Sequence, residues 1–291
     1  MIVGAHCSGG VKRSLDKAEE IGADAVQLFV QSPRAWRFPQ HDPDDLARFR
    51  ERRKELKLGG AFVHTLYLVN LASPDDTVYE KSASVMRSTM ETACAIGADG
   101  VVFHVGSHLG AGFEEGLKRV VPALESVLEL CSEETWLLVE NSAGAGATIG
   151  RSVDELATIV DRLGRHPRLG ICLDTCHLWV SGYDVTDADA VDALMADVDA
   201  RIGLDRFRVL HVNDARDGLG SNRDHHANIG EGTIGDNMAA MLGHPAVRNL
   251  LAVLEVPGPD DHGPDAAEIA KLKALYKKAA ARYRRRQKRS R

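Results

Sequence analysis

The sequence predicts a single-domain α/β fold, the (β/α)8 or TIM barrel, from three observations. Eight short apolar runs recur along the 291 residues, and their starts lie about 23 to 42 residues apart. The runs are continuous rather than alternating in polarity, which is typical of parallel strands covered on both faces. Amphipathic segments separate them, and the first strand–helix turn lacks the G-x-G-x-x-G pattern of dinucleotide-binding sheets. We therefore expect a barrel, with the active site at the carboxyl ends of its strands.

The predicted strands cover residues 2–6, 25–30, 61–65, 100–105, 137–142, 169–175, 209–214 and 251–256. Helices are expected between them, for example over residues 11–22, 42–60 and 151–164, because each of these amphipathic segments ends at glycine. The second begins with Asp42-Pro43, the usual order of a capping residue and a proline at a helix start. The phrase EEIGADAVQLF (19–29) recurs as CAIGADGVVFH (94–104), which indicates a repeated helix–glycine–strand step.

Composition indicates a cytoplasmic protein with no membrane partner. Hydrophobic residues make up 44% and charged residues 27%, as in ordinary soluble domains. No apolar run approaches the roughly 20 residues that cross a bilayer, and the N-terminus lacks the basic and apolar segments of a secretory signal. The five cysteines are odd in number and contain no C-x-x-C pair, so we expect reduced thiols.

The last residues differ in charge from the rest of the chain. Residues 277–291 contain nine Lys or Arg and no acid, which leaves 27 basic against 42 acidic residues in the preceding body. We therefore divide the chain into a catalytic barrel at 1–276 and a flexible basic tail at 277–291. The tail fits an arm that touches phosphates, and a solvated extension that only aids solubility is equally consistent with it.

Metal-binding side chains recur at the ends of the predicted strands. A lone histidine there is more often a hydrogen-bonded core residue than a ligand, but a buried carboxylate without partners costs several kcal/mol. Six successive strands each end in such a residue, which indicates a metal cluster. Bound cations would offset the free-energy cost of burying these polar side chains. The candidate ligands are His64, His104, Glu140, Asp174, His177, His211, Asp224, His226 and Glu255.

This donor set indicates zinc or another first-row transition metal, because imidazoles and carboxylates dominate it. Cys176 lies between two candidate ligands, but as the neighbour of His177 it is expected to point elsewhere. A catalytic zinc has about three protein ligands, so nine ligands match about three Zn²⁺ ions with one shared carboxylate. Three Zn²⁺ and four carboxylates leave a net charge of about +2, which would attract a phosphate. Mn²⁺ or Fe²⁺ could occupy one position.

Seven motifs resemble, in order, those of the endonuclease IV family, the zinc-dependent apurinic/apyrimidinic endonucleases of DNA base-excision repair. They are VHTLYLVNLASP, VVFHVGSH, LLVENSAG, LDTCH, HVND, RDHH…IGEG and LEV, and the resemblance covers about residues 2–275. It implies that Glu140 bridges two zinc ions. One of these ions would also be held by His64 and His104, the other by Asp174, His211 and Glu255, and a third ion by His177, Asp224 and His226.

The resemblance also implies the reaction. The phosphodiester 5′ to an abasic deoxyribose would be hydrolysed to leave a 3′-hydroxyl and a 5′-deoxyribose phosphate. Zinc lowers the pKa of bound water, and Glu140 would orient or deprotonate the attacking water as the catalytic residue. The expected partner is double-stranded DNA with abasic sites, and the expected state is a monomer.

Arg34 and Tyr67 match the family residues that enter the duplex at the lesion, and Trp36 is a further candidate for DNA contact in SPRAWRF. Without the resemblance, Trp36 and Tyr67 would be interpreted as half-buried loop aromatics. Several positions depart from the family pattern without touching a proposed ligand, and they put loop shape and one phosphate contact in doubt. They are Thr65, Leu66, Val105 and His225; His6, His108 and His225 are further candidates to hydrogen-bond the ligands.

Two other functions stay open. A metal-dependent sugar isomerase or epimerase on a related barrel would use Glu140, Asp174, His211 and Glu255, but has no evident need for His177, Asp224 and His226 together. A non-catalytic nucleic-acid-binding protein would use the basic tail and leaves the buried ligand set unexplained.

Overall fold

The computed structural model describes the backbone of residues 1–289 and the side chains of residues 1–285, and it confirms the TIM barrel. Within this part of the chain, eight parallel strands close into a barrel in the order β1-β10-β7-β6-β5-β4-β3-β2. Pairing of β1 with β10, for example Ile2 with Leu251, closes the ring. The strands are β1 (Ile2–His6), β2 (Ala25–Leu28), β3 (Ala61–His64), β4 (Gly100–Phe103), β5 (Trp136–Glu140), β6 (Leu169–Asp174), β7 (Phe207–His211) and β10 (Leu251–Leu254).

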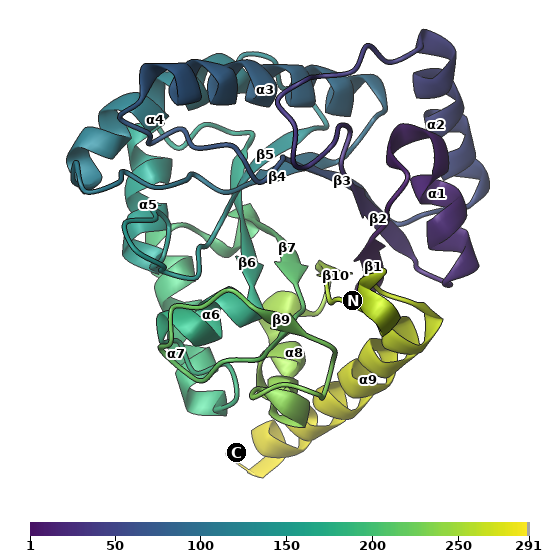
Figure 1. The fold of residues 1–291 in the computed structure, drawn as a ribbon. Helices are drawn as coiled ribbons and strands as arrows, with labels where there is room; N and C mark the ends of the chain where they lie inside the picture. Colours follow the sequence, from purple (N-terminus) through teal and green to yellow (C-terminus); the bar gives the residue numbers. More distant parts are fainter. Residues whose placement is uncertain (290–291) are drawn as a thin grey trace.

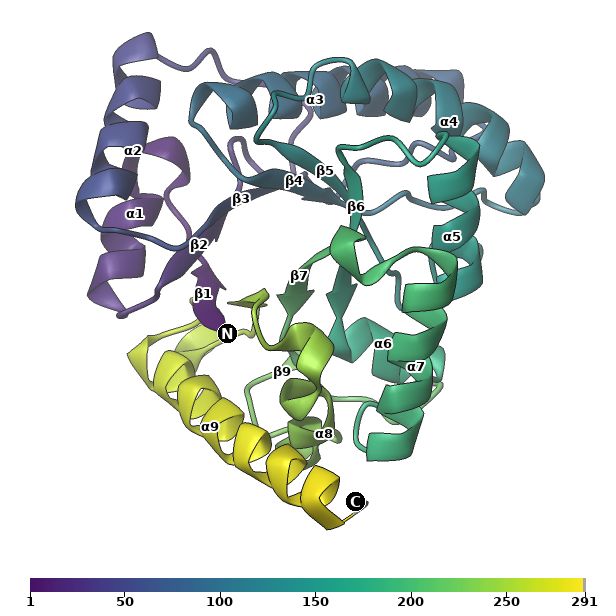
Figure 2. The same cartoon turned by 180° about the vertical axis from the view of Figure 1, so that it is seen from behind.

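Helices surround the ring of strands (Figures 1 and 2). Several begin at an expected capping residue: Asp42 accepts a hydrogen bond from the Asp44 amide, and Ser152 accepts one from the Glu155 amide. The helices are α1 (Gly10–Glu20), α2 (Pro43–Glu55), α3 (Asp76–Ala95), α4 (Phe113–Leu128), α5 (Val153–Arg162), α6 (Thr175–Ser181), α7 (Ala188–Arg201), α8 (Ala239–Gly243) and α9 (Ala266–Arg289). Short 3-10 turns lie at η1 (Leu204–Arg206), η2 (Gly235–Met238), η3 (Pro245–Val247) and η4 (Pro259–Asp261).

The core has two parts because each strand buries both faces. Val63 and Val101 belong to the large cluster between the strands and the helices. Their neighbours Phe62 and Val102 belong to a second cluster formed by strand residues, which fills the barrel interior. This double burial explains why the strands are continuous apolar runs in the sequence. The interior cluster consists of Ala25, Phe62, Val102, Leu138, Cys172, Val209, Leu251 and Val253.

Most predicted strands run one to three residues too long at their carboxyl ends. Residues 29–30, 104–105 and 255–256 follow the ends of β2, β4 and β10 instead of belonging to them. At these residues the chain leaves the hydrogen-bonded sheet and forms the loops at the carboxyl ends of the strands. We call this end of the barrel the mouth. A two-stranded hairpin of β8 (Asp214–Ala215) and β9 (His226–Ala227) was not predicted, since two-residue strands leave no periodic pattern.

The predicted boundary at residue 276 falls inside α9, which continues to Arg289. Ala279 and Ala280 are buried, so packing against the barrel extends beyond the boundary. Flexibility of the basic tail stays a prediction, and its last residues, 290–291, lie outside the described part of the chain. All five cysteines are free, and none of the described helices is long and apolar enough to span a membrane.

Candidate metal centre

Eight polar side chains form a ring above the barrel interior, one within a residue of the carboxyl end of each strand. Side chains of a strand alternate between its two faces, so a residue two positions after an interior residue also points inward. Glu140 follows interior Leu138 in this way, and Asp174 follows Cys172. The ring consists of His6, Gln27, His64, His104, Glu140, Asp174, His211 and Glu255.

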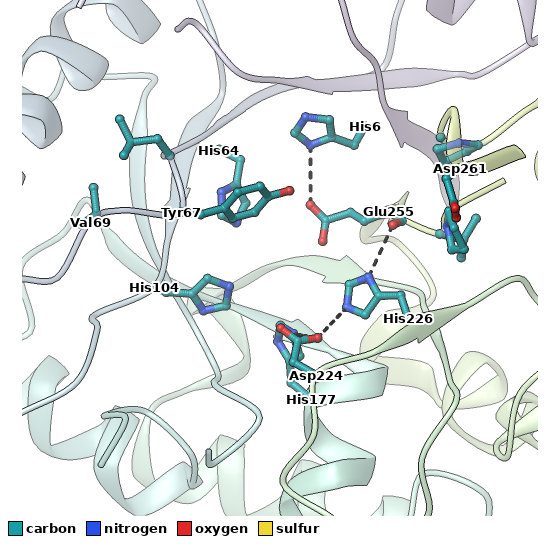
Figure 3. A pocket seen from close by; sticks show the side chains of 15 residues that line it. His6, His64, Tyr67, Val69, His104, His177, Asp224, His226, Glu255 and Asp261 are labelled. Carbon is teal, nitrogen blue, oxygen red and sulfur yellow. Dashed lines mark hydrogen bonds and ion pairs between the residues drawn. The ribbon is translucent and has the colours of Figure 1, made fainter. Parts of the chain in front are cut away.

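A cavity of about 620 Å³ opens above this ring (Figure 3). His64 and His104 line one part of it, and Glu255 lines another. His177 and His226 complete the polar lining from outside the barrel strands. The cavity therefore exposes nitrogen and oxygen donors from several separate chain segments to one space.

Glu140 lies beneath the cavity and joins two groups of donors. Its side chain is fully buried. Its Oε2 atom is 3.0 Å from Nε2 of His64 and 3.3 Å from Nε2 of His104. Its Oε1 atom is 3.0 Å from Nδ1 of His211. Each carboxylate oxygen thus faces a different set of imidazoles, which is the arrangement a bridging ligand requires.

Asp174 and Glu255 complete the group around His211. Nδ1 of His211 is 3.2 Å from Oε2 of Glu255 and 3.9 Å from Oδ2 of Asp174. Two donors on one tetrahedral zinc, each about 2.0–2.2 Å from the ion, lie about 3.4 Å apart. The spacing of these donors therefore fits one shared cation, as does that of the group containing His64 and His104.

The third group depends on α6 and the β8–β9 hairpin. Asp174 caps α6 by accepting a hydrogen bond from the His177 amide, and this single turn directs the His177 ring into the cavity. The hairpin supplies Asp224 and His226. Oδ1 of Asp224 is 3.1 Å from Nε2 of His177 and 3.2 Å from Nε2 of His226. The structure thus brings all nine predicted ligands together in three groups.

Hydrogen bonds on the far side of the imidazoles fix which ring nitrogen faces each group. Nδ1 of His64 lies 2.7 Å from the Thr65 carbonyl oxygen, and Nδ1 of His177 lies 3.0 Å from that of Asn141. Nε2 of His211 lies 2.9 Å from Oε1 of Gln27. These acceptors hold the proton of a neutral imidazole, so its lone pair points at the carboxylates.

A cation between the groups is required to make this arrangement favourable, because lone pairs and carboxylate oxygens repel one another. Nε2 of His177 and Nε2 of His226 are buried, and the nearest charged atom to both is Oδ1 of Asp224. Protonation of the imidazoles would supply positive charge of the same kind. Although burial opposes charge, Asp174 and Asp224 raise the pKa of His177 well above its usual value, and Asp224 raises the pKa of His226 to about 9. The donor set therefore fits resident metal ions.

The carboxylates remain ionised in this setting. Burial alone would raise the pKa of Glu140, but the adjacent imidazoles of His104, His211 and His177 hold it well below the usual range. The pKa of Glu255 is likewise lowered, since His211 outweighs the effect of burial. Burial raises the pKa of the Cys172 thiol to about 12 and that of Cys176 further, so both nearby thiols stay protonated. Nitrogen and oxygen donors, rather than sulfur, thus face the cavity in the form that binds zinc.

Three buried amides that the sequence interpretation missed hold the ligands in place. Gln27 donates from Nε2 to Oε1 of Glu255 and accepts from His211. Asn141 accepts from the Asp174 amide, and Asn213 donates to Oδ2 of Asp174. A polar residue within an apolar strand was the available signal for Gln27.

Asp214, also missed, organises the loop that follows the β8–β9 hairpin, directly after the strand that contains His226. Its fully buried carboxylate accepts hydrogen bonds from backbone amides along residues 230–235, at 3.0 to 3.3 Å. A Cβ atom at Gly232 would lie 2.4 Å from Oδ1 of Asp214, so the loop can wrap this closely only with glycine there. The carboxylate thus replaces secondary structure as the partner of these amides.

Of the predicted DNA-contact residues, Tyr67 lines the cavity and Arg34 lines a second one that shares His6 and Asp261 with it. Tyr67 is 65% exposed, and its ring packs edge-on against Phe29 with centroids 5.3 Å apart. Its amide donates to the Pro33 carbonyl, which ties this loop to the one containing Arg34. Arg34 is exposed, whereas Trp36 is half-buried against the core. Tyr67 and Arg34 are therefore available to a ligand, and Trp36 offers only part of its ring.

The three additional histidines differ in their contacts. His6 lies 3.6 Å from Oε1 of Glu255 and so belongs to the ligand surroundings. His108 accepts a hydrogen bond from the Gly112 amide in its own loop. His225 pairs with Asp217 at 2.8 Å. The departures from the family pattern at Thr65, Leu66 and Val105 are buried.

Comparison with known proteins identifies related chains. The family model described as xylose isomerase-like TIM barrel matches residues 15–284. A probable endonuclease 4 from Methanoculleus marisnigri is 39% identical over 279 residues, covering 94% of this chain and 99% of that protein. The crystal structure of endonuclease IV from Thermus thermophilus aligns with a TM-score of 0.83 and 32% identity over 96% of this chain and all of that one. A D-tagatose 3-epimerase-like protein aligns with a TM-score of 0.73 at 19% identity, over 98% and 99% of the two chains, and shares the fold.

We predict that Asp214→Asn loosens residues 230–235, because an amide nitrogen would face backbone donors in place of an acceptor. The loss of charge-assisted hydrogen bonds should lower the free energy of unfolding by about 2 kcal/mol or more. Hydrogen exchange of peptides covering 228–235, with thermal unfolding, measures both effects. Asp217→Asn, whose carboxylate pairs with His225 at the surface, is the control. Unchanged exchange in the Asp214 variant would show that the loop holds its shape without this carboxylate.

Proposed function

The chain belongs to the endonuclease IV family of xylose isomerase-like TIM barrels, and from this premise we propose that it is a zinc-dependent apurinic/apyrimidinic endonuclease of DNA base-excision repair. Family membership makes it a nuclease of the hydrolase class. The proposed reaction hydrolyses the phosphodiester 5′ to an abasic site in double-stranded DNA. Its products are a 3′-hydroxyl and a 5′-deoxyribose phosphate, and we propose that a monomer performs it.

One observation carries the proposal: Glu140 directs its two oxygens to two separate donor groups, and a third group lies beside them. His64 and His104 would hold one zinc ion with Glu140, and Asp174, His211 and Glu255 would hold the second. His177, Asp224 and His226 would hold the third. When bound, the zinc ions supply Lewis-acid stabilisation of phosphate charge and acidify water.

The residues of the chain account for the remaining parts of the reaction. Water attacks phosphorus, the bond from phosphorus to the 3′-oxygen of the preceding nucleotide breaks, and that oxygen takes up a proton. Glu140 is proposed to orient or deprotonate the attacking water, because its carboxylate is ionised and lies beneath the cavity. The buried amides of Gln27, Asn141 and Asn213 keep the ligands in position throughout.

Arg34 and Tyr67 are proposed to enter the duplex at the lesion. An abasic nucleotide lacks a stacked base, so its extrusion costs less free energy than that of an intact nucleotide. A side chain inserted into the gap recovers part of the lost stacking. Tyr67 is suited to this role, because its exposed ring is supported from below by Phe29. Trp36 would contribute through the exposed part of its ring.

The sugar isomerase interpretation rests on the fold and on four ring residues. Epimerases share the barrel at less than 25% identity, which shows a common fold alone. An isomerase with one or two metals leaves the group of His177, Asp224 and His226 without a role. Because this group is assembled by two elements outside the barrel, α6 and the hairpin, the nuclease accounts for more of the structure.

The proposal predicts about three zinc ions per chain and incision of a duplex that contains one synthetic abasic site. Chelation should abolish incision, and added zinc should restore it. Elemental analysis gives the metal content, and mapping of the cut ends on a denaturing gel gives the position of cleavage. One metal per chain, an intact duplex and turnover of a ketose would establish the isomerase instead.

Glu140→Gln should reduce incision by about 10²- to 10⁴-fold, because it removes both the bridging charge and the proton acceptor. The metal content should fall by up to two ions, with the third group keeping its own. Glu134→Gln is the matched control, since this exposed acid precedes the same strand at the far end of the barrel. Full activity in the Glu140 variant would remove the basis of the mechanism.

Tyr67→Ala should weaken binding of an abasic duplex by about tenfold or more, the effect of losing one aromatic stacking partner. Binding of an intact duplex and the metal content should change little. Tyr67→Phe keeps the ring and should bind like the parent protein. Equilibrium titration of labelled duplexes measures the difference; equal losses for both duplexes in the Ala variant would argue against a wedge.

A further inference from the structure

Helix α9 begins at the mouth and ends at the opposite end of the barrel. Pro264, just before the helix, lines the cavity. Further along, Nζ of Lys273 lies 3.1 Å from the carbonyl oxygen of Gly22, which precedes β2. The Tyr276 hydroxyl lies 3.5 Å from the carbonyl oxygen of Arg248, which precedes β10. Because residues that precede a strand lie at its amino end, α9 has crossed the whole barrel by residue 276.

The basic residues come after residue 276, at the point where α9 has already crossed the barrel. Residues 277–285 lie about 16 to 28 Å from Ala266 along the helix axis, at 1.5 Å per residue. In both views the end of α9 extends past α8 (Figures 1 and 2). Ala279 and Ala280 are buried and hold this part of the helix on the body. The basic end surface consists of the exposed side chains Lys277, Lys278, Arg282, Arg284 and Arg285.

We propose that the basic end surface binds the phosphates of a second DNA segment while the mouth holds the first. The inference rests on the proposed function only in placing the first duplex at the mouth. DNA is stiff over about 150 base pairs, so a duplex across the mouth does not fold back to the other end of the barrel within a few helical turns. A contact at this surface therefore belongs to a separate segment, or to distant sequence of the same molecule.

The chemistry of the surface favours nucleic acid over other polyanionic partners. Residues 277–291 contain no acid, while the rest of the chain has 42 acidic against 27 basic residues. The acidic body repels DNA, so a concentrated positive surface supplies the attraction that phosphates require. A membrane-binding helix would present an apolar face to lipid, but the apolar residues Leu275, Ala279 and Ala280 are buried against the body. A protein interface would need an apolar centre, which the five exposed cations do not provide.

The test uses the full-length metal-loaded protein with two differently labelled duplexes. The first, of about 15 base pairs, carries an abasic analogue and a non-hydrolysable linkage, so that it occupies the mouth without being cut. The second is an undamaged duplex, added by titration. Coincident fluorescence or sedimentation detects the ternary complex. Anionic vesicles containing phosphatidylserine serve as a competing probe.

Lys278→Gln/Arg282→Gln/Arg285→Gln should raise the Kd of the second duplex by about tenfold or more at low salt, and should flatten its salt dependence. Incision of a cleavable abasic duplex of the same length, assayed separately, should stay within about twofold, because the changes lie far from the mouth. Glutamine preserves helix propensity, so α9 should remain folded. Lys54→Gln/Lys57→Gln/Lys81→Gln, which removes three exposed cations elsewhere, should leave both measurements unchanged.

Three outcomes would overturn the inference. Weaker binding of the first duplex by the α9 variant would show that the surface touches the same segment as the mouth. No ternary complex with the parent protein would show a solvated extension, and vesicle binding without a second duplex would identify a lipid surface. Each is separable from failure of the proposed function, which would appear as absent incision with either variant or with the parent protein.

Discussion

The structure of the mouth depends on one electrostatic constraint, a fully buried carboxylate at Glu140 that must be neutralised. Its oxygens lie 3.0 to 3.3 Å from the nearest nitrogens of His64, His104 and His211, and no lysine or arginine is among these contacts. Neutral imidazoles accept metals but do not cancel charge. The cations needed to stabilise this carboxylate are therefore the same cations that would act on a phosphate. The same cations would therefore stabilise the folded mouth and act in the proposed reaction.

Two kinds of support hold the donors in place. Strand geometry positions the ring from His6 to Glu255, because hydrogen bonds between neighbouring strands fix the height of each residue. The group of His177, Asp224 and His226 is not positioned by hydrogen bonds between barrel strands. It relies on the Asp174 cap of α6 and on the β8–β9 hairpin, and the carboxylate of Asp214 in β8 binds the amides of residues 230–235 that follow the hairpin. A charged side chain thus holds the loop that follows the ligand-bearing hairpin, which lacks regular structure of its own.

The two ends of the barrel differ in their proposed tasks. The mouth is proposed to recognise a local defect, through exposed Tyr67 and the candidate metal ligands. The far end presents lysines and arginines without a cavity of comparable chemistry among the described residues, which suits contact with any phosphate backbone. A contact that is independent of sequence, remote from the lesion, would keep an acidic protein near DNA while the mouth searches for damage.

The sequence by itself determined the barrel, because continuous apolar runs such as 100–105 report burial on both faces whatever the exact ends of the strand. It also determined the inward positions at the strand ends, since period-two alternation places His64, His104 and Glu140 on the same face as the interior residues before them. The same rule would have identified Gln27. The tertiary structure alone decided the rest. Asp224 comes from the irregular loop between β8 and β9, and His226 from β9 itself. The loop that follows β9 is held by amides converging on Asp214, and the end of α9 is placed by packing of Ala279 and Ala280. Both depend on contacts between distant segments, which leave no period in the sequence.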